Sequence, residues 1–147
     1  MGLATQSFIP PLSSSMSKMV RKNISVREAA CSCCGELPSD RLLDRLQALR
    51  DACGFPLRFT SIYRCPTYNK SIGGHPNSAH RLGAQSNEYG AADIGIHKRY
   101  AKKRFIIIFN FYNLMFNNFE VCNGHIHVGI VPPSHPMFNS LYWGISK

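Results

Sequence analysis

Leucines recur at helical spacing in the segment between Ser39 and Gly54. The stripe consists of Leu42, Leu43, Leu46 and Leu49. Residues three and four positions apart lie on one face of an α-helix, so this pattern predicts an amphipathic helix with its leucines in the core. Serine is a preferred N-cap and glycine often follows a helix C-terminus, so Ser39 and Gly54 mark the two ends.

Alternating polar and apolar residues predict strands in two other regions. Residues 56–61 alternate in this way and follow the predicted helix closely. Residues 119–122 and 125–130 flank the dipeptide Asn123-Gly124, which is typical of a type I′ turn. We therefore expect a β-hairpin over residues 119–130.

The second arm of this hairpin carries two histidines. Alternation places His125 and His127 on one face of the strand. The opposite face carries Ile126, Val128 and Ile130. Two imidazoles on one face of a rigid strand suit a metal ion, although a hydrolytic zinc site usually has a third protein ligand.

Residues 100–116 carry conflicting signals, because their β-branched residues favour a strand whereas their length favours a helix. We predict a helix. Residues 132–147 are expected to form a loop-like tail, with Tyr142 and Trp143 packing back on the sheet. No run reaches the roughly 18 apolar residues of a membrane helix, so no membrane span is expected.

Residues 1–22 contain prolines and serines but no apolar periodicity, which predicts a flexible N-terminal extension. They lack the features of a signal peptide, so we expect synthesis in the cytoplasm and another route of export. Residues 23–147 are expected to form one compact domain. The chain has 147 residues, 44% of them hydrophobic, which is enough for a modest core. We predict an α+β fold with a small antiparallel sheet flanked by helices.

The formal net charge is +9 and the pI is about 9.5, which suits either nucleic acid or another anionic surface. The basic residues are scattered, apart from a dense cluster at 97–104. No reader motif for nucleic acid accompanies them, so no specific nucleic-acid partner is expected. Attraction to an anionic surface other than nucleic acid is the alternative.

The six cysteines are unevenly distributed, with Cys31, Cys33 and Cys34 close together in the sequence. The run C-x-C-C differs from the usual C-x-x-C spacing of a zinc knuckle. A second zinc site that uses Cys31, Cys34 and another residue is one alternative, and disulfides are another. Reduced thiols are the default for a chain without an evident export signal.

Five short blocks occur in a fixed order between residues 61 and 127. They read S-x-Y-R-C-P from Ser61, N-K-x-x-G-G from Asn69, S-x-H-R-x-G from Ser78, A-A-D-I from Ala91 and H-x-H from His125. In this order they resemble the M15 zinc peptidases, the D-alanyl-D-alanine carboxypeptidase and phage endolysin type. The resemblance extends over residues 22–130 and is specific because it depends on five blocks together.

The resemblance implies a zinc ion held by His80, Asp93 and His127, with an open position for water. It also implies that His125 assists the attack of water. The planar guanidinium of Arg64 would bind the C-terminal carboxylate of a peptide, or pair with a structural carboxylate.

Ser78 resembles the serine that precedes the zinc histidine in the family, where it binds substrate or caps its loop. Glu120 is the runner-up for the base, because some relatives have a glutamate three residues before the last zinc ligand. That position is Gly124 here, whereas Glu120 lies seven residues before His127. We therefore expect Glu120 to be an exposed strand residue.

The chain departs from the family pattern H-x-x-G-x-A-A-D, in which the aspartate follows the histidine by seven residues. Here Asp93 follows His80 by thirteen, and the simplest alignment inserts residues 84–89. The uninterrupted count would reach Asn87, and amides rarely bind zinc. We assign the ligand to Asp93, with the neighbouring Glu88 as the alternative.

The resemblance implies a zinc-dependent peptidase that acts as a monomer on D-amino-acid-containing stem peptides of bacterial peptidoglycan. It would act at the cell wall, with release at lysis if the chain is of phage type. A competing hypothesis is a non-catalytic wall-binding or metal-binding module whose zinc site has been disrupted by the insertion at 84–89.

Overall fold

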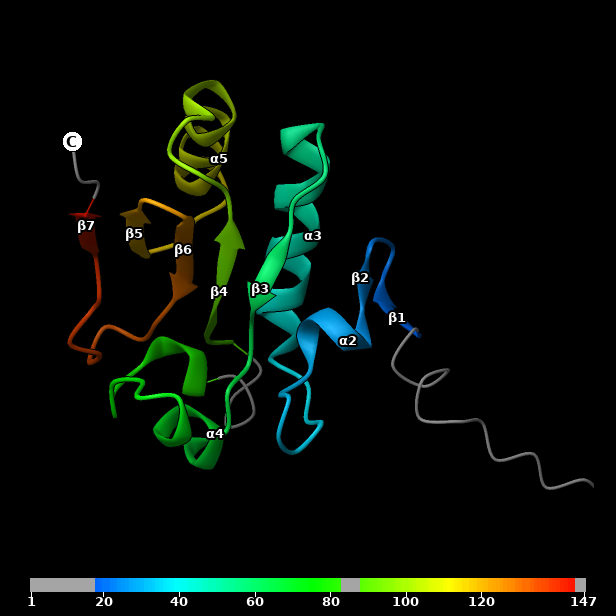
Figure 1. Cartoon of the computed structure of the whole chain (residues 1–147), viewed down its shortest axis with the longest axis vertical. Coiled ribbons are helices and arrows are strands. Elements are labelled where there is room, and N and C mark those ends of the chain that lie inside the picture. Colours follow the sequence, from blue (N-terminus) through cyan, green and yellow to red (C-terminus); the bar gives the residue numbers. More distant parts are fainter. Residues whose placement is uncertain (1–17, 83–87, 145–147) are drawn as a thin grey trace, which may run out of the picture.

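The computed structural model describes residues 18–82 and 88–144 as helices and two sheets joined by loops (Figure 1). In chain order the elements are β1 (Met19–Arg21), β2 (Ile24–Ser25), α2 (Val26–Ala29), α3 (Asp40–Cys53), β3 (Phe59–Ser61), α4 (Pro66–Ser71), the 3-10 helix η2 (Ala79–Arg81), β4 (Gly90–Gly95), α5 (Ala101–Asn113), β5 (Asn118–Cys122), β6 (His125–Ile130) and β7 (Ser140–Gly144). The predicted α+β class is confirmed.

The main sheet has the strand order β3-β4-β6-β5-β7. Its first three pairs are antiparallel, as expected, but β5 and β7 are parallel, so the sheet is mixed. The end of β6 lies beside the start of β5, with Gly129 opposite Asn118. The short connection at 131–139 keeps the chain at this end of the sheet, so β7 starts where β5 starts and runs the same way.

The C-terminal tail therefore differs from the predicted loop. It forms the edge strand β7, in which Tyr142 pairs with Glu120 of β5 and Trp143 with Val121. The two aromatic side chains are 56% and 60% exposed, so they do not pack back on the sheet as expected. Backbone hydrogen bonds with β5 hold this segment instead of side-chain burial.

Helix α3 begins and ends where the sequence predicts. The Oγ of Ser39 accepts a hydrogen bond from the Leu42 amide at 3.3 Å, and Gly54 has a φ of 69°. A left-handed residue at this position suits glycine, which has no Cβ to clash with the preceding turn. The four leucines of the stripe are fully or almost fully buried.

Helices α3 and α5 cover one face of the main sheet and contact each other (Figure 1). The core between these helices and the sheet includes side chains that alternate along the three central strands. These are Ala92 and Ile94 of β4, Ile126, Val128 and Ile130 of β6, and Phe119 and Val121 of β5. The intervening residues of the same strands point to the opposite face. That face carries the candidate site.

Residues 101–113 form the predicted helix α5, with Ile107 and Phe111 in the core. The buried Arg104 donates hydrogen bonds from this helix to the carbonyls of Ile96 and Asn123, at 3.0 and 3.2 Å, and to the carbonyl of Cys122. The helix therefore braces the end of the β5–β6 hairpin.

The turn of that hairpin is not of the expected type I′. A type I′ turn needs positive φ at both central residues. Neither Asn123 nor Gly124 is among the described residues with positive φ. The carbonyls of Asn123 and Gly124 accept hydrogen bonds from the amides of Lys98 and Ile96. The β4–α5 connection thus fixes the turn in another conformation.

The folded part of the chain starts earlier than residue 23. Met19–Arg21 forms strand β1, and Arg21 binds Asp44 and Asp40 of α3 at 2.7 and 3.0 Å. Residues 1–17, the rest of the expected extension, lie outside the described residues. No described helix is long and apolar enough to cross a membrane.

Replacing Leu46 by alanine is expected to lower the free energy of unfolding by about 2–5 kcal/mol, because a fully buried leucine leaves a cavity. Leu37→Ala is the matched control, since this exposed leucine should cost less than about 0.5 kcal/mol. Urea denaturation of both variants measures the difference. Equal losses would contradict the assignment of the leucine stripe to the core.

Candidate metal centre and active site

Three side chains from distant parts of the sequence meet on the sheet face opposite α3 and α5. His80 comes from η2, Asp93 from β4 and His127 from β6. One ligand atom from each lies within 4.8 Å of the others. The Oδ1 of Asp93 is 3.1 Å from Nε2 of His80 and 3.0 Å from Nδ1 of His127.

Strand pairing places two of these residues, and a packed loop places the third. Asp93 and His127 are directly opposite each other in the antiparallel β4–β6 pair. His80 follows Ala79, which packs against Ala91 and Val131 in a small cluster of buried residues. The carbonyl of His80 also accepts a hydrogen bond from the Arg64 amide at 3.1 Å.

The second nitrogen of each imidazole faces an oxygen acceptor. His80 Nδ1 lies 2.7 Å from the carbonyl oxygen of Ile62, and His127 Nε2 lies 2.7 Å from Oδ1 of Asn118. The other nitrogen of each ring faces Asp93. A neutral imidazole that donates its one N–H to the outer oxygen can bind a metal through this second nitrogen. Outer hydrogen bonds of this kind orient histidine ligands in metal sites.

Burial and hydrogen bonds have opposite effects on the pKa values of His80 and Asp93. Burial lowers the pKa of His80 below its ordinary value, although its hydrogen bond with Asp93 acts in the opposite direction. Burial alone would raise the pKa of Asp93, but hydrogen bonds from His127 and His80 hold it well below its usual range. Two histidine nitrogens and a carboxylate oxygen are a donor set that zinc prefers, so the residues fit this metal.

Arg64 approaches the other oxygen of the same carboxylate. Its Nη2 is 2.9 Å from Oδ2 of Asp93, and its Nε donates to Oγ of Ser61 at 2.9 Å. The guanidinium therefore pairs with a carboxylate of the protein itself, which is the second of the two roles that the sequence suggested for Arg64. Neither contact uses Nη1, which leaves donors of the guanidinium for another anion.

A cavity of about 590 Å³ opens over the three converging residues. Its lining includes Arg64, Ser78, His125 and Glu120. Ser78 also accepts a hydrogen bond from the His80 amide at 3.3 Å, so it caps the η2 turn. All the site residues expected from the sequence thus border one space, and its volume is in the range of small-ligand pockets.

Glu120 and Asn118 also border this cavity; the sequence interpretation weighed Glu120 as a base but set it aside, and it did not single out Asn118. Glu120, expected to be exposed, is half-buried and lies opposite His127 in the β5–β6 pair. Asn118 is buried and binds His127 directly. The signal that could have found them is alternation, because Asn118 and Glu120 lie on the face of β5 that adjoins the histidine face of β6; the predicted hairpin contained Glu120 but began one residue after Asn118.

Asp93 is the carboxylate that meets the two histidines. Among the described residues, the group that can hold a metal with His80 and His127 contains Asp93 and not Glu88. This geometry agrees with the alignment that treats residues 84–89 as an insertion. Residues 84–87 of that insertion lie outside the described residues.

In metal-free protein, the free energy of unfolding is expected to fall as the pH drops through 6.5, the ordinary pKa of histidine. The folded state keeps His80 neutral, whereas the unfolded chain takes up the proton, so stability is lost toward lower pH. Urea denaturation in chelator between pH 8 and pH 5 measures this slope. His80→Asn should reduce the slope, and the exposed control His97→Asn should retain it. A slope unchanged by His80→Asn would refute the assignment.

One comparison with known proteins gives a match. The model of a family described as Peptidase M15 matches residues 15–129, a span that contains Arg64 and the three converging residues. Comparisons with curated proteins and with solved structures give no match. Since the matched span covers most of the sequence, the chain belongs to the peptidase M15 family, whose members are in general zinc-dependent peptidases.

Proposed function

We propose that this protein is a zinc peptidase that hydrolyses D-amino-acid-containing peptides of bacterial peptidoglycan. The observation that carries the proposal is the convergence of two imidazole nitrogens on the carboxylate of Asp93, at the base of a cavity. Family membership supports peptide hydrolysis. The substrate class comes from the resemblance of the sequence blocks to wall-cutting M15 enzymes.

His80, Asp93 and His127 would hold the zinc ion. When bound, zinc acts as a Lewis acid and lowers the pKa of a water molecule toward about 7. His125 borders the cavity two residues before His127, on the same strand face. In the proposed reaction its imidazole accepts a proton from the attacking water and returns it to the leaving amine.

Glu120 competes with His125 for this role. It borders the same cavity from the neighbouring strand and lies opposite His127. A carboxylate close to the site can also accept a proton from water. We assign the base to His125 because the late H-x-H block places it as in related enzymes, and we treat Glu120 as the alternative to be tested.

Arg64 and Ser78 would bind the substrate. Arg64 keeps one guanidinium edge on Asp93 and Ser61, and the remaining donors can bind a peptide carboxylate. This arrangement favours a substrate with a free C-terminus, such as a stem peptide that ends in D-alanine. The charge of +9 favours approach to anionic wall polymers by general electrostatic attraction.

Asp93→Ala is expected to abolish zinc binding at this site and to lower peptidase activity by at least about 100-fold, because a ligand and its charge are lost. Glu88→Ala is the matched control and should retain both. Zinc content is measured on the purified proteins, and activity as D-alanine release from stem peptides and as cleavage of cross-linked muropeptides. Wild-type protein without zinc at this site, or without either activity, would instead favour the non-catalytic binding module.

His125→Ala is expected to lower kcat by about 10²- to 10⁴-fold while zinc content stays unchanged, since general-base catalysis has this magnitude. Glu120→Gln should have a much smaller effect. The dependence of kcat/KM on pH distinguishes the two bases, because the limb due to the base should disappear only in the variant that lacks it. A larger loss in Glu120→Gln would transfer the role to Glu120.

A further inference from the structure

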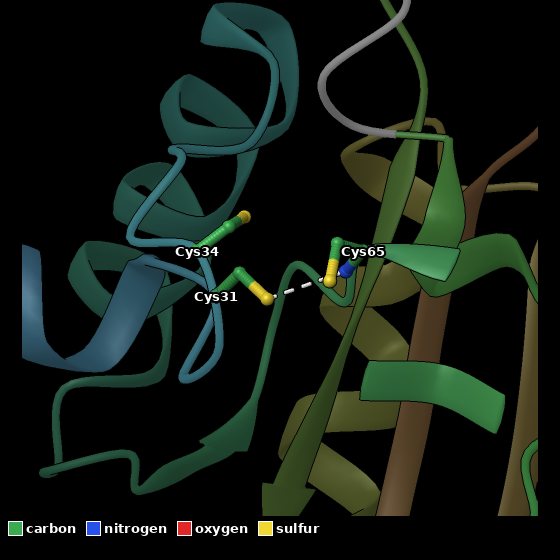
Figure 2. Close-up of side chains that lie close together, drawn as sticks. All are labelled: Cys31, Cys34 and Cys65. Carbon is green, nitrogen blue, oxygen red and sulfur yellow. Dashed lines mark hydrogen bonds between the residues drawn. The ribbon is translucent and has the colours of Figure 1, made fainter. Parts of the chain in front are cut away.

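A second group of potential metal ligands lies away from the catalytic cavity. The sulfur atoms of Cys31, Cys34 and Cys65 all lie within 4.8 Å of one another. Figure 2 shows the side chains of Cys31 and Cys34 extending toward Cys65, which comes from a different part of the chain. A fourth thiol, that of Cys33, directly precedes Cys34 in the chain and is exposed. We call Cys31, Cys33, Cys34 and Cys65 the thiol cluster.

The loop that carries three of these thiols is tightly folded around Cys31. The Gly35 amide donates to the carbonyl of Cys31 at 2.9 Å, and the Cys31 amide donates to the carbonyl of Glu36 at 2.9 Å. Gly35 has a φ of 73°, which glycine adopts without strain. Two residues separate Cys31 from Cys34, so this pair has the C-x-x-C spacing of a zinc knuckle although the run reads C-x-C-C.

Backbone amides surround the buried sulfurs. The Cys65 amide donates to the Cys31 sulfur at 3.3 Å, and the amides of Cys33 and Cys34 also donate to it. The Tyr68 amide donates to the Cys65 sulfur at 3.3 Å. Such donors stabilise negative charge on sulfur, and second-shell contacts of this kind orient the ligands of a metal.

The surroundings of the thiol cluster argue for a structural role. Cys31 and Cys65 pack with Tyr63 and Tyr68 in a small cluster separate from the main core. Residues 31–38 contain no helix or strand, and Leu37 within them is exposed. A loop with so little apolar burial gains stability from a metal that links it to another segment.

We propose that the thiol cluster binds a structural zinc ion, with Cys31, Cys34 and Cys65 as ligands and Cys33 as the fourth. Zn–S bonds of about 2.3 Å in a tetrahedron separate the sulfurs by about 3.8 Å, so small side-chain rotations bring the three sulfurs to this spacing. Soft thiolates and tetrahedral geometry select zinc over hard cations.

A zinc ion at the thiol cluster would also restrict the position of a residue in the catalytic cavity. Cys65 directly follows Arg64, whose guanidinium binds Asp93 and whose amide binds the carbonyl of His80. An ion that ties Cys65 to the loop at 31–34 would restrict the backbone at Arg64. The zinc at the thiol cluster is therefore proposed to position Arg64 without touching the substrate.

Cobalt substitution distinguishes the two metal sites. Co²⁺ bound by thiolates gives a sulfur-to-metal charge-transfer band in the near ultraviolet, whereas a site of two imidazoles and a carboxylate has no sulfur ligand. The full-length protein loaded with Co²⁺ is expected to show this band. Cys31→Ser, Cys34→Ser and Cys65→Ser should each remove most of it, and the matched control Cys122→Ser should retain it. Absence of the band from reduced wild-type protein would overturn the proposal.

Thiol protection tests the same proposal in wild-type protein, so it does not depend on the folding of a variant. Cys33 and Cys34 are exposed and should react readily with an alkylating reagent after chelation. Zinc is expected to slow their alkylation at least about tenfold, while the alkylation of Cys122 stays unchanged. Equal rates with and without zinc would overturn the proposal, as would a disulfide within the thiol cluster of protein prepared with zinc. Both readouts concern sulfur alone, so they are independent of peptidase activity.

Discussion

The in-register pairing of β4 with β6 is the constraint on which the rest of the structure depends. It sets Asp93 opposite His127, and it sets Ile94 opposite Ile126 on the other face. Because side chains alternate along a strand, a slip of one residue would exchange the two faces. The polar groups of the candidate site would then point toward the helices and the core residues into the cavity. Burial of the apolar face against α3 and α5 therefore also positions the site.

The charge at the centre of the site explains how its remaining parts are arranged. Asp93 is an ionised carboxylate in a largely buried position, where an unpaired charge is costly. Arg64 neutralises one of its oxygens, and two imidazoles face the other. The outer hydrogen bonds to Ile62 and Asn118 direct the second nitrogen of each ring toward the carboxylate. These contacts arrange two nitrogens and one oxygen around a position that suits a metal cation.

The segment from Ser61 to Cys65 connects the two clusters of potential ligands. Ser61 and Arg64 contact each other beside Asp93. The sulfur of Cys65 lies close to the sulfurs of the loop at 31–34. Its intervening residues, Ile62 and Tyr63, are buried in two different apolar clusters. The two clusters of potential ligands are therefore joined by a short and tightly packed stretch of backbone.

Local patterns in the sequence were sufficient where one element determines the outcome. The leucine stripe, its Ser39 cap and Gly54 predicted α3, and alternation in β6 placed His125 and His127 on one face. The sequence blocks predicted that His80, Asp93 and His127 belong together. Asp93 could be preferred over Glu88 because an insertion in a loop costs little, since closure entropy grows slowly with length.

Contacts between distant segments decided the rest. The parallel edge strand β7, the conformation of the Asn123-Gly124 turn and the approach of Cys65 to Cys31 all depend on where other segments lie. Glu120 and Asn118 entered the site only through the register of β5 with β6. The sequence by itself determined which face of each element is apolar and which residues are candidates for the site, because both follow from side-chain type, local period and the order of the blocks. The tertiary structure alone decided how these candidates meet and which further residues join them, because that depends on strand register and packing between segments far apart in the chain.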